Sequence, residues 1–461
     1  MSQIPDRAYG EIASDLEEFD SYLSGLGVGK PSTDAREPNR MRPSGAEGCE
    51  MATAERHRWQ FAARFRRNAF GWRSQPAIAR VQEAVAEIRK VRRSNSVLAA
   101  EGAVLFLEKV SPALEHVDSS SGAIGNAINR AIAELVPVIA TAPADLARRS
   151  VWLERLWEAY TADQIPYIET LGDFWGELCA GRELASVWAE ALFDGLRENW
   201  ERHEPGVYFH GTPVCLSSLL AAGRYQELLE LLDKAPFVWW EYRRWGAQAL
   251  AAMGKKTEAI AYAEASRGLN DDPSAIARAC EEILLSMGQS KEAYERYAIA
   301  ANQSASYLAT YRAILRKYPE KTPREILSDL LRSTPGEEGK WFATAKEAGL
   351  LELAIELANR SPSDPRTLTR AARDLMDKNP AFALEAGLAA LRWLAQGYGY
   401  EVTGADVWAA YSHTIQAAER LGRRDEVRKC IRELVPTAGF VADVLGRELG
   451  PGGQPGISKK S

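Results

Sequence analysis

The sequence contains few cysteines and few histidines, five of each in 461 residues. The cysteines, at positions 49, 179, 215, 280 and 430, form no C-x-x-C pair and have no regular spacing. Neither a disulfide framework nor a thiolate metal site is therefore expected, and a reducing cytoplasm fits this pattern best. The sequence predicts no cofactor and no bound metal.

Long apolar runs are also lacking. The longest candidate, residues 131–142, contains Glu134 and Pro137, whereas a membrane-spanning helix needs ~20 predominantly apolar residues. Residues 1–20 are acidic and lack the basic start and apolar run of a secretory signal. We expect a cytoplasmic protein with no membrane partner.

No sign of charge dominates. The 57 basic and 63 acidic side chains leave a net charge of −6, too weak a bias to name a partner from the total. With 46% hydrophobic and 26% charged residues, the chain has enough apolar material for a continuous core. Its length suits two or three domains or one elongated repeat array.

Alternating runs of β-branched residues are absent, and the apolar period is helical nearly throughout, as at Val81, Val85 and Ile88. Several helix starts are marked by a capping side chain followed by proline at the first helical position, where the missing N–H costs nothing. These pairs are Asp272-Pro273, Thr322-Pro323, Asp364-Pro365 and Asn379-Pro380. The sequence predicts an all-α protein.

A short pattern recurs five times in the C-terminal half. The copies align on Gly223, Gly254, Gly288, Gly349 and Gly422, and in four of them a glutamate follows the glycine by four residues. The first two intervals between the glycines are 31 and 34 residues, and the third, of 61 residues, is about two units long. A degenerate copy at Asn379 divides the last interval. A unit of this length holds two helices that bury their apolar faces only by stacking on neighbouring hairpins.

The segments GKKTEAI, from Gly254, and GQSKEAY, from Gly288, resemble the turn and second helix of tetratricopeptide repeats. Ala259 and Ala293 stand at that family's small packing position. The resemblance covers about residues 213–449 and implies a right-handed α-α superhelix whose first helices line a concave groove. Residues 98–179 are also similar to an uncharacterised bacterial helical family, which implies no activity.

The expected organisation has four parts, divided by composition. Residues 31–48 combine proline, glycine, serine and charge without apolar periodicity, which is typical of a disordered linker. Residues 204–213 hold two prolines and two glycines and form the best internal boundary. The parts are a disordered segment and linker (1–50), an irregular helical domain (51–204), the repeat array (205–449) and a disordered tail (450–461).

The segment from Arg56 to Arg93 holds eleven basic residues against two acidic ones, giving a local charge of +9. Tryptophans and phenylalanines are interleaved with them. In nucleic-acid-binding proteins such basic residues bind phosphates and such aromatic rings stack on bases. Arg64, Arg66 and Arg67 are the candidate nucleic-acid-binding residues. Alternatively, the aromatic side chains anchor a helix to the body and leave the arginines in solvent.

Arginines at equivalent places in the repeats are candidates for binding a partner. Arg244 and Arg278 each lie ten residues ahead of a turn glycine, and Arg366, Arg370 and Arg373 form an i, i+4, i+7 stripe. The aromatic run at Trp239 and Trp240 could supply apolar anchors, although such residues often fill the space between hairpins. Alternatively, these five arginines are solvated and bind no partner.

No catalytic motif is found, so we expect a non-enzymatic protein that binds another protein or an acidic peptide segment in the groove. A nucleic-acid-binding protein using residues 56–93 is the alternative, and homo-oligomerisation is left open. An enzyme with a site at the junction of residues 208–215 is a third reading, because His210 and Cys215 lie there.

Deletion of residues 1–48 should leave the melting temperature nearly unchanged, because the linker has too few apolar groups to join a core. Scanning calorimetry of the full and shortened chains measures the difference. A fall of more than ~5 °C, the scale of about 1 kcal/mol in a domain, would show that the segment packs.

Overall fold

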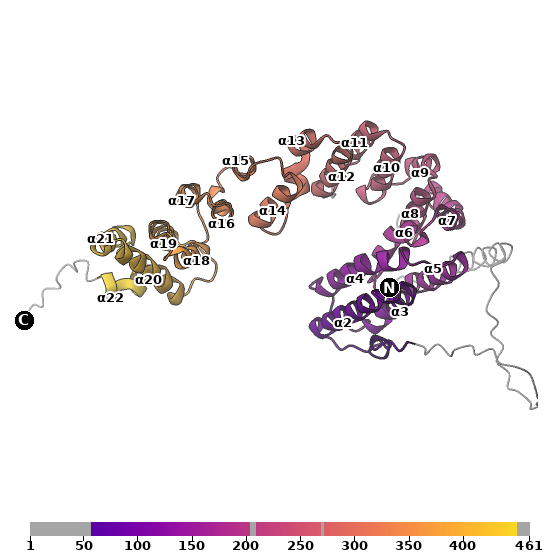
Figure 1. Ribbon diagram of the computed structural model, residues 1–461, viewed down its shortest axis with the longest axis horizontal. Coiled ribbons are helices and arrows are strands. Elements are labelled where there is room, and N and C mark those ends of the chain that lie inside the picture. Colours follow the sequence, from indigo (N-terminus) through magenta and orange to yellow (C-terminus); the bar gives the residue numbers. More distant parts are fainter. Residues whose placement is uncertain (1–56, 203–208, 269–271, 450–461) are drawn as a thin grey trace, which may run out of the picture. The chain divides into compact units, whose positions relative to one another are not determined.

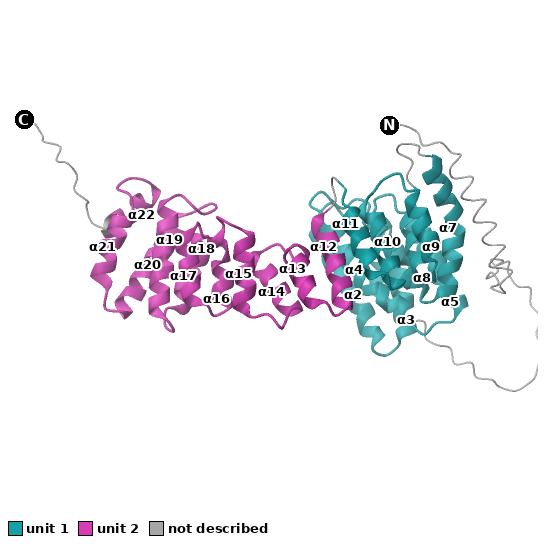
Figure 2. Ribbon diagram, turned by 90° about the horizontal axis from the view of Figure 1, so that it is seen from above, with its two compact units in different colours: residues 1–271 teal, residues 272–461 magenta. Residues whose placement is uncertain are grey.

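The computed structural model describes residues 57–202, 209–268 and 272–449 (Figure 1). These residues are mostly helical and contain no strand, which confirms the all-α class. Contacts divide the chain into two compact units, residues 1–271 and 272–461 (Figure 2). The predicted disordered segments 1–50 and 450–461 lie outside the described residues.

The first unit begins with longer helices and continues with two shorter hairpins. Its elements are η1 (Phe61–Ala63), α2 (Ser74–Arg92), α3 (Ser96–Ala113), α4 (Ala123–Ala140), α5 (Leu146–Thr161), η2 (Glu169–Phe174), α6 (Trp175–Cys179), α7 (Arg182–Arg202), α8 (Thr212–Ala222), α9 (Tyr225–Asp233), α10 (Trp240–Ala252) and α11 (Lys256–Ala265).

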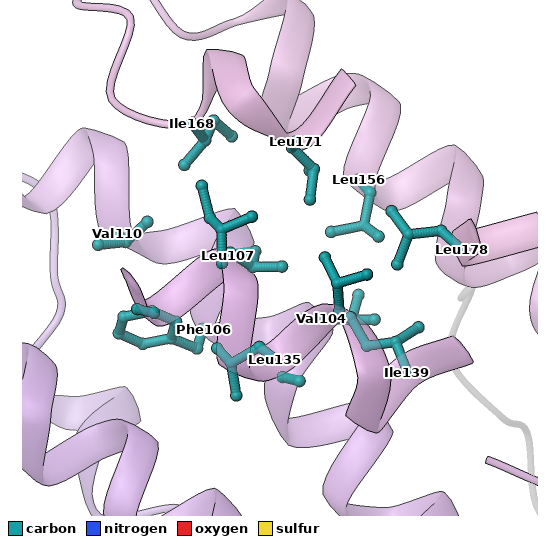
Figure 3. Packing of buried hydrophobic residues seen from close by; sticks show 14 of the residues in the cluster. Val104, Phe106, Leu107, Val110, Leu135, Ile139, Leu156, Ile168, Leu171 and Leu178 are labelled. Atoms are coloured by element: carbon teal, nitrogen blue, oxygen red, sulfur yellow. The ribbon is translucent and has the colours of Figure 1, made fainter. Parts of the chain in front are cut away.

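Aliphatic side chains from four helices fill the core of the first unit. Figure 3 shows Leu107 of α3, Leu135 of α4, Leu156 of α5 and Leu178 of α6 meeting there, all essentially without solvent exposure. Local signals fix where these helices start: the Asn95 side chain accepts from an N–H in the first turn of α3, and that of Asp145 does so at α5.

Helix α4 is long and apolar enough, by length and composition, to cross a membrane, and no other described helix is. It carries Arg130 and Glu134, and eight of its residues are buried against the rest of the unit. Its packing partners are α2, α3 and α6. The apolar composition of α4 is therefore accounted for by its position in the core.

Arg149 of α5 is a charged residue inside this core, with 5% of its surface exposed. Its guanidinium donates to three backbone carbonyls: Nη1 to Ile139 (3.1 Å) and Leu178 (3.2 Å), and Nη2 to Ala142 (2.8 Å). Ile139 and Ala142 lie at the C-terminus of α4, and Leu178 lies at that of α6. The cation thus lies at the C-terminal ends of two helices, where the helix dipole favours a positive charge. The carbonyls of Ile139 and Ala142 also accept backbone N–H groups.

The division between the units falls after residue 271, whereas the sequence suggested a boundary at 204/205. Helices α7 and α8, on either side of residues 203–208, pack along each other. Leu196 and Trp200 of α7 share one buried cluster with Leu216 of α8 and Leu231 of α9. The apolar core therefore continues past the proline-glycine connector, a feature that its composition does not reveal.

The second unit consists of successive short helices. They are α12 (Pro273–Ser286), α13 (Ser290–Ala301), α14 (Tyr307–Lys317), α15 (Pro323–Ser333), η3 (Glu338–Trp341), α16 (Phe342–Glu347), α17 (Leu351–Arg360), α18 (Pro365–Leu375), α19 (Pro380–Ala395), α20 (Gly404–Arg420), α21 (Arg424–Leu434) and α22 (Phe440–Leu449).

The predicted caps at the proline-started helices are confirmed. Asp272, Thr322, Asp364 and Asn379 each precede a helix and accept a hydrogen bond from a backbone N–H in its first turn. At Thr322 the backbone N–H donates in return to the carboxylate of Glu325, which completes a capping box. The 61-residue interval in the glycine pattern contains the hairpin of α14 and α15, which turns without a glycine.

The five aligned glycines all adopt the left-handed conformation, with φ between +68° and +81°. At each turn the N–H after the glycine donates to the carbonyl five residues earlier, as from Lys255 to Leu250 at 2.9 Å. An added Cβ would meet nothing within 4 Å at Gly254 or Gly288, so the backbone angle is what favours glycine there. These are closed helix C-caps of one recurring geometry.

At three of the five turns, the glutamate that follows the glycine helps to stabilise the turn. The side chain after the glycine is basic there and forms an ion pair with that glutamate: Arg224 with Glu227 at 2.5 Å, Lys255 with Glu258 at 3.4 Å, and Arg423 with Glu426 at 2.5 Å. The recurring glutamate in the sequence therefore has a local structural role at the start of the second helix.

Replacing Arg149 by methionine should lower the free energy of unfolding of the first unit by about 1–3 kcal/mol, because three buried carbonyls lose the hydrogen bond from the guanidinium. Urea unfolding followed by circular dichroism measures the loss. Arg148→Met is the matched control, since Arg148 is the exposed neighbour on the same helix. Equal stability of the two variants would contradict a role for the buried guanidinium.

Candidate functional site

Three of the predicted arginines lie together in the second unit. Arg366, Arg370 and Arg373 of α18 line one hollow of about 380 Å³, which lies against α20. The remaining lining residues come from α18, α19 and α20: Pro365, Thr369, Leu394, Asp406, Ala409 and His413. This hollow, called the α18–α20 hollow below, is the candidate site.

Local sequence determines which side chains reach it. Asp364 caps α18, and from there the helical period places the arginines on one face and buried Leu368, Ala371 and Ala372 on the other. Helix α20 begins with a capping box in which Thr403 and Asp406 bond each other's backbone N–H groups. Positions i, i+3 and i+7 from Asp406 then face α18.

Two of the three arginines are paired within the chain. Arg366 binds Asp406 through both oxygens, Nε to Oδ1 at 2.9 Å and Nη2 to Oδ2 at 3.0 Å, and these bonds hold the pKa of the Asp406 carboxyl well below its usual range. Arg373 forms an ion pair with its neighbour Asp374 at 2.8 Å. Arg366 is therefore least available to a partner.

Arg370 differs from its neighbours. Its guanidinium donates two long hydrogen bonds, to the carbonyl of Arg366 (3.3 Å) and to the hydroxyl of Thr367 (3.2 Å). It forms no ion pair with a described carboxylate. Its side chain is exposed at the hollow. Arg370 thus offers most of its N–H groups, together with an uncompensated charge, to a ligand.

His413 is a site residue that the sequence reasoning missed. Its Nδ1 atom is buried and has no hydrogen-bond partner among the described residues. Burial, together with the nearby charge of Arg373, lowers the pKa of the ring, so His413 is neutral at pH 7. A usable signal was present: His413 lies nine residues ahead of Gly422, as Arg370 does ahead of Asn379.

Arg244 and Arg278 are not brought to this hollow. Arg244 lies in the first unit, where it forms an ion pair with Asp173 and stacks 4.6 Å above the ring of Trp245. Arg278 lies in the second unit and donates to the carbonyl of Ala301 at 3.5 Å. The charge of Arg244 is compensated inside the chain, which removes the basis for assigning it to a partner.

The two predicted tryptophans are separated by the start of α10. Trp240 is buried, whereas Trp239 is 45% exposed and stacks on the exposed ring of Phe237 with 4.6 Å between ring centroids. Trp245 of the same run is also buried. Only Trp239 of the predicted pair can serve as an apolar anchor, and it lies in the first unit.

The described part of the basic segment is not one continuous helix. Described residues 57–73 hold only the short turn η1, and α2 begins at Ser74, because Pro76 is tolerated in a first turn but not deeper in a helix. Trp59, Phe61 and Phe65 are buried, so they anchor the segment. Trp72 is an exception, with 72% of its surface exposed.

The candidate nucleic-acid-binding arginines are largely compensated. Arg64 pairs with Glu83 at 2.6 Å and Arg67 with Glu115 at 3.6 Å. Arg66 is exposed and has no ion pair among the described residues. A single-stranded nucleic acid also requires exposed aromatic rings on which its bases stack. Because Trp59, Phe61 and Phe65 are buried, most of that stacking surface lies inside the core.

His210 and Cys215, the candidate residues of the third reading, and Cys179 are engaged in packing. His210 contacts the backbone carbonyl of Tyr160 through Nε2 at 3.1 Å, and burial raises the pKa of the Cys215 thiol. Burial also raises the pKa of Cys179, to about 12, so its thiolate is inaccessible at neutral pH. No group of histidine, cysteine and carboxylate ligands that could hold a metal occurs in the described part of the chain.

No protein-family model matches the sequence, and no curated protein does. The chemistry of the α18–α20 hollow is therefore the main guide to what this chain binds. Cationic N–H donors at its rim, with apolar Leu394 and Ala409 in its lining, suit an anionic group carried on a larger ligand.

Single-stranded nucleic acid should bind weakly or not at all at physiological salt, because Trp59, Phe61 and Phe65 are buried and Arg64 and Arg67 are paired. Fluorescence anisotropy with a labelled oligonucleotide over a salt series measures this. Submicromolar binding that falls steeply with salt, and is lost when Arg64, Arg66 and Arg67 are replaced by glutamine, would instead favour a nucleic-acid function.

Proposed function

We propose that this protein is a non-enzymatic adaptor that binds an acidic segment of another protein in the α18–α20 hollow. The observation that carries this proposal is Arg370, an exposed and uncompensated cation in a hollow lined by two further arginines. Each charge-assisted hydrogen bond to such a side chain contributes about 1.5–3 kcal/mol. A few contacts of this kind account for micromolar affinity.

The helix order supports a tetratricopeptide-like array with a right-handed superhelix. Helices α18 and α19 pack as a hairpin, α20 packs on both, and the pair of α20 and α21 follows. The hollow then lies between the first helices of two successive hairpins, α18 and α20. In repeat arrays such a face presents an extended binding surface.

The chemistry also favours binding over catalysis. In the lining, the carboxylate of Asp406 is bound by the guanidinium of Arg366 through two hydrogen bonds, and His413 is neutral. Guanidinium groups stay protonated and act as fixed cations, which suits recognition of an anion. The exposed ring of Trp239 in the first unit is a separate anchor for an apolar part of a partner. We place this function in the cytoplasm.

Charge reversal by Arg370→Glu should weaken binding of acidic peptides by about tenfold or more, the equivalent of losing one charge-assisted contact. A panel of labelled acidic peptides, assayed by fluorescence anisotropy, supplies the ligands. The fold should stay intact, because the substitution is on an exposed helix face.

Arg360→Glu is the matched control. Arg360 is exposed at the end of α17, is paired with Glu356 and does not line the hollow. Acidic peptides that bind both variants as tightly as the unaltered chain, or that bind none of the three, would overturn the proposed function.

A further inference from the structure

We propose that the α18–α20 hollow recognises a phosphate monoester, carried as a phosphorylated side chain on the partner segment. This inference rests on the proposed function and specifies the anion that the hollow accepts. It is drawn from the charge count of the lining, the number of unused donors and the negative charges that border the hollow.

The charge of the lining suits a dianion better than a single carboxylate. Three guanidinium groups and one carboxylate, that of Asp406, line the hollow, and His413 is neutral. Arg366 is matched by Asp406, which leaves Arg370 without an ion-pair partner and Arg373 bound to the exposed Asp374 beside the hollow. A phosphorylated side chain carries about −1.5 to −2 at pH 7. A single carboxylate would match Arg370 alone, whereas a dianion can bind Arg370 and Arg373 together.

Unused donors are also present in sufficient number. Arg370 and Arg373, one turn apart on α18, have most of their N–H groups unengaged by the described residues. A phosphoryl group offers three acceptor oxygens, and arginine binds such oxygens through two N–H groups at a time. The ring of His413 adds a group whose Nδ1 has no described partner.

The acidic residues around the hollow argue against an extended polyanion. Asp406 lies in the lining and Asp374 is beside Arg373. Asp364 is exposed at the start of α18, next to the lining residue Pro365. A nucleic-acid backbone, with one charge on every diester, would run past these carboxylates, whereas a single phosphorylated side chain can end between Arg370 and Arg373.

The size of the hollow suits an attached phosphate better than the free ion. A volume of about 380 Å³ lies at the lower end of the range for small-ligand cavities, roughly 300–1,000 Å³. Pro365, Leu394 and Ala409 supply apolar surface beside the arginines. This surface can contact the carbon atoms of the phosphorylated residue and its neighbours, and inorganic phosphate would leave it empty.

The test compares three peptide libraries that differ only at one central position: phosphoserine, glutamate or serine, with randomised flanks. The phosphoserine library should bind at least about tenfold more tightly than the glutamate library, since it offers a second charge and more acceptors. Arg370→Gln should remove most of this advantage, and Arg360→Gln should leave it unchanged. Inorganic phosphate should bind more weakly than the phosphoserine library.

A second readout follows the His413 ring by NMR, assigned with His413→Gln. Saturating phosphoserine peptide should shift its resonances and raise its pKa, because a neighbouring dianion favours the imidazolium. Equal binding of the glutamate and phosphoserine libraries through Arg370 would overturn this inference and leave the proposed function standing.

The other outcomes are also decisive. Phosphoserine binding that survives Arg370→Gln and leaves His413 unshifted would place the phosphate elsewhere and overturn the inference. Tighter binding of a single-stranded oligonucleotide than of the phosphoserine library, dependent on Arg370, would assign the hollow to nucleic acid instead. Failure of all acidic and phosphorylated ligands would refute both proposals.

Discussion

The structure depends on reversing the chain tightly between helices that cannot bury their apolar faces alone. At five such reversals a glycine with positive φ closes the first helix and lets the second start within about two residues. The left-handed conformation costs a residue with a Cβ about 1–2 kcal/mol. Because the turn geometry recurs, each second helix leaves its hairpin in the same way, and successive hairpins can present equivalent faces.

The packing of α18 and α20 on α19 explains why a hollow forms between α18 and α20. Helix α18 buries Leu368 and Ala372 on its inner face, so its arginines must point to the opposite face. Helix α20 approaches that face, and Thr414 fits against Gly387 of α19, where a Cβ would lie only 2.2 Å from the Thr414 hydroxyl. Close packing of α19 and α20 thus fixes the wall opposite the arginines.

Local features of this fold could be predicted from the sequence, because a cap or a turn is determined by residues a few positions apart. The Asp364 cap, the turn at Gly254 and the α18 arginine stripe are of this kind. The pairing of Arg244 with Asp173 could not be predicted, because it joins residues 71 positions apart and depends on tertiary packing. Likewise, only packing decides that Trp240 is buried while Trp239 is exposed.

In the proposed function, the arginines of α18 divide structural and binding roles between them. The Arg366–Asp406 pair spans α18 and α20 with two-point geometry, and Asp406 is already held by the Thr403 capping box. This pair therefore positions the wall opposite Arg370 and contributes little attraction for an external anion. Because Arg366 is matched by Asp406 and Arg373 by Asp374, the unmatched positive charge in the hollow lies one turn further along the helix than Arg366, at Arg370. An anion that enters there meets two guanidinium groups without displacing a buried carboxylate, so the desolvation cost of binding stays small.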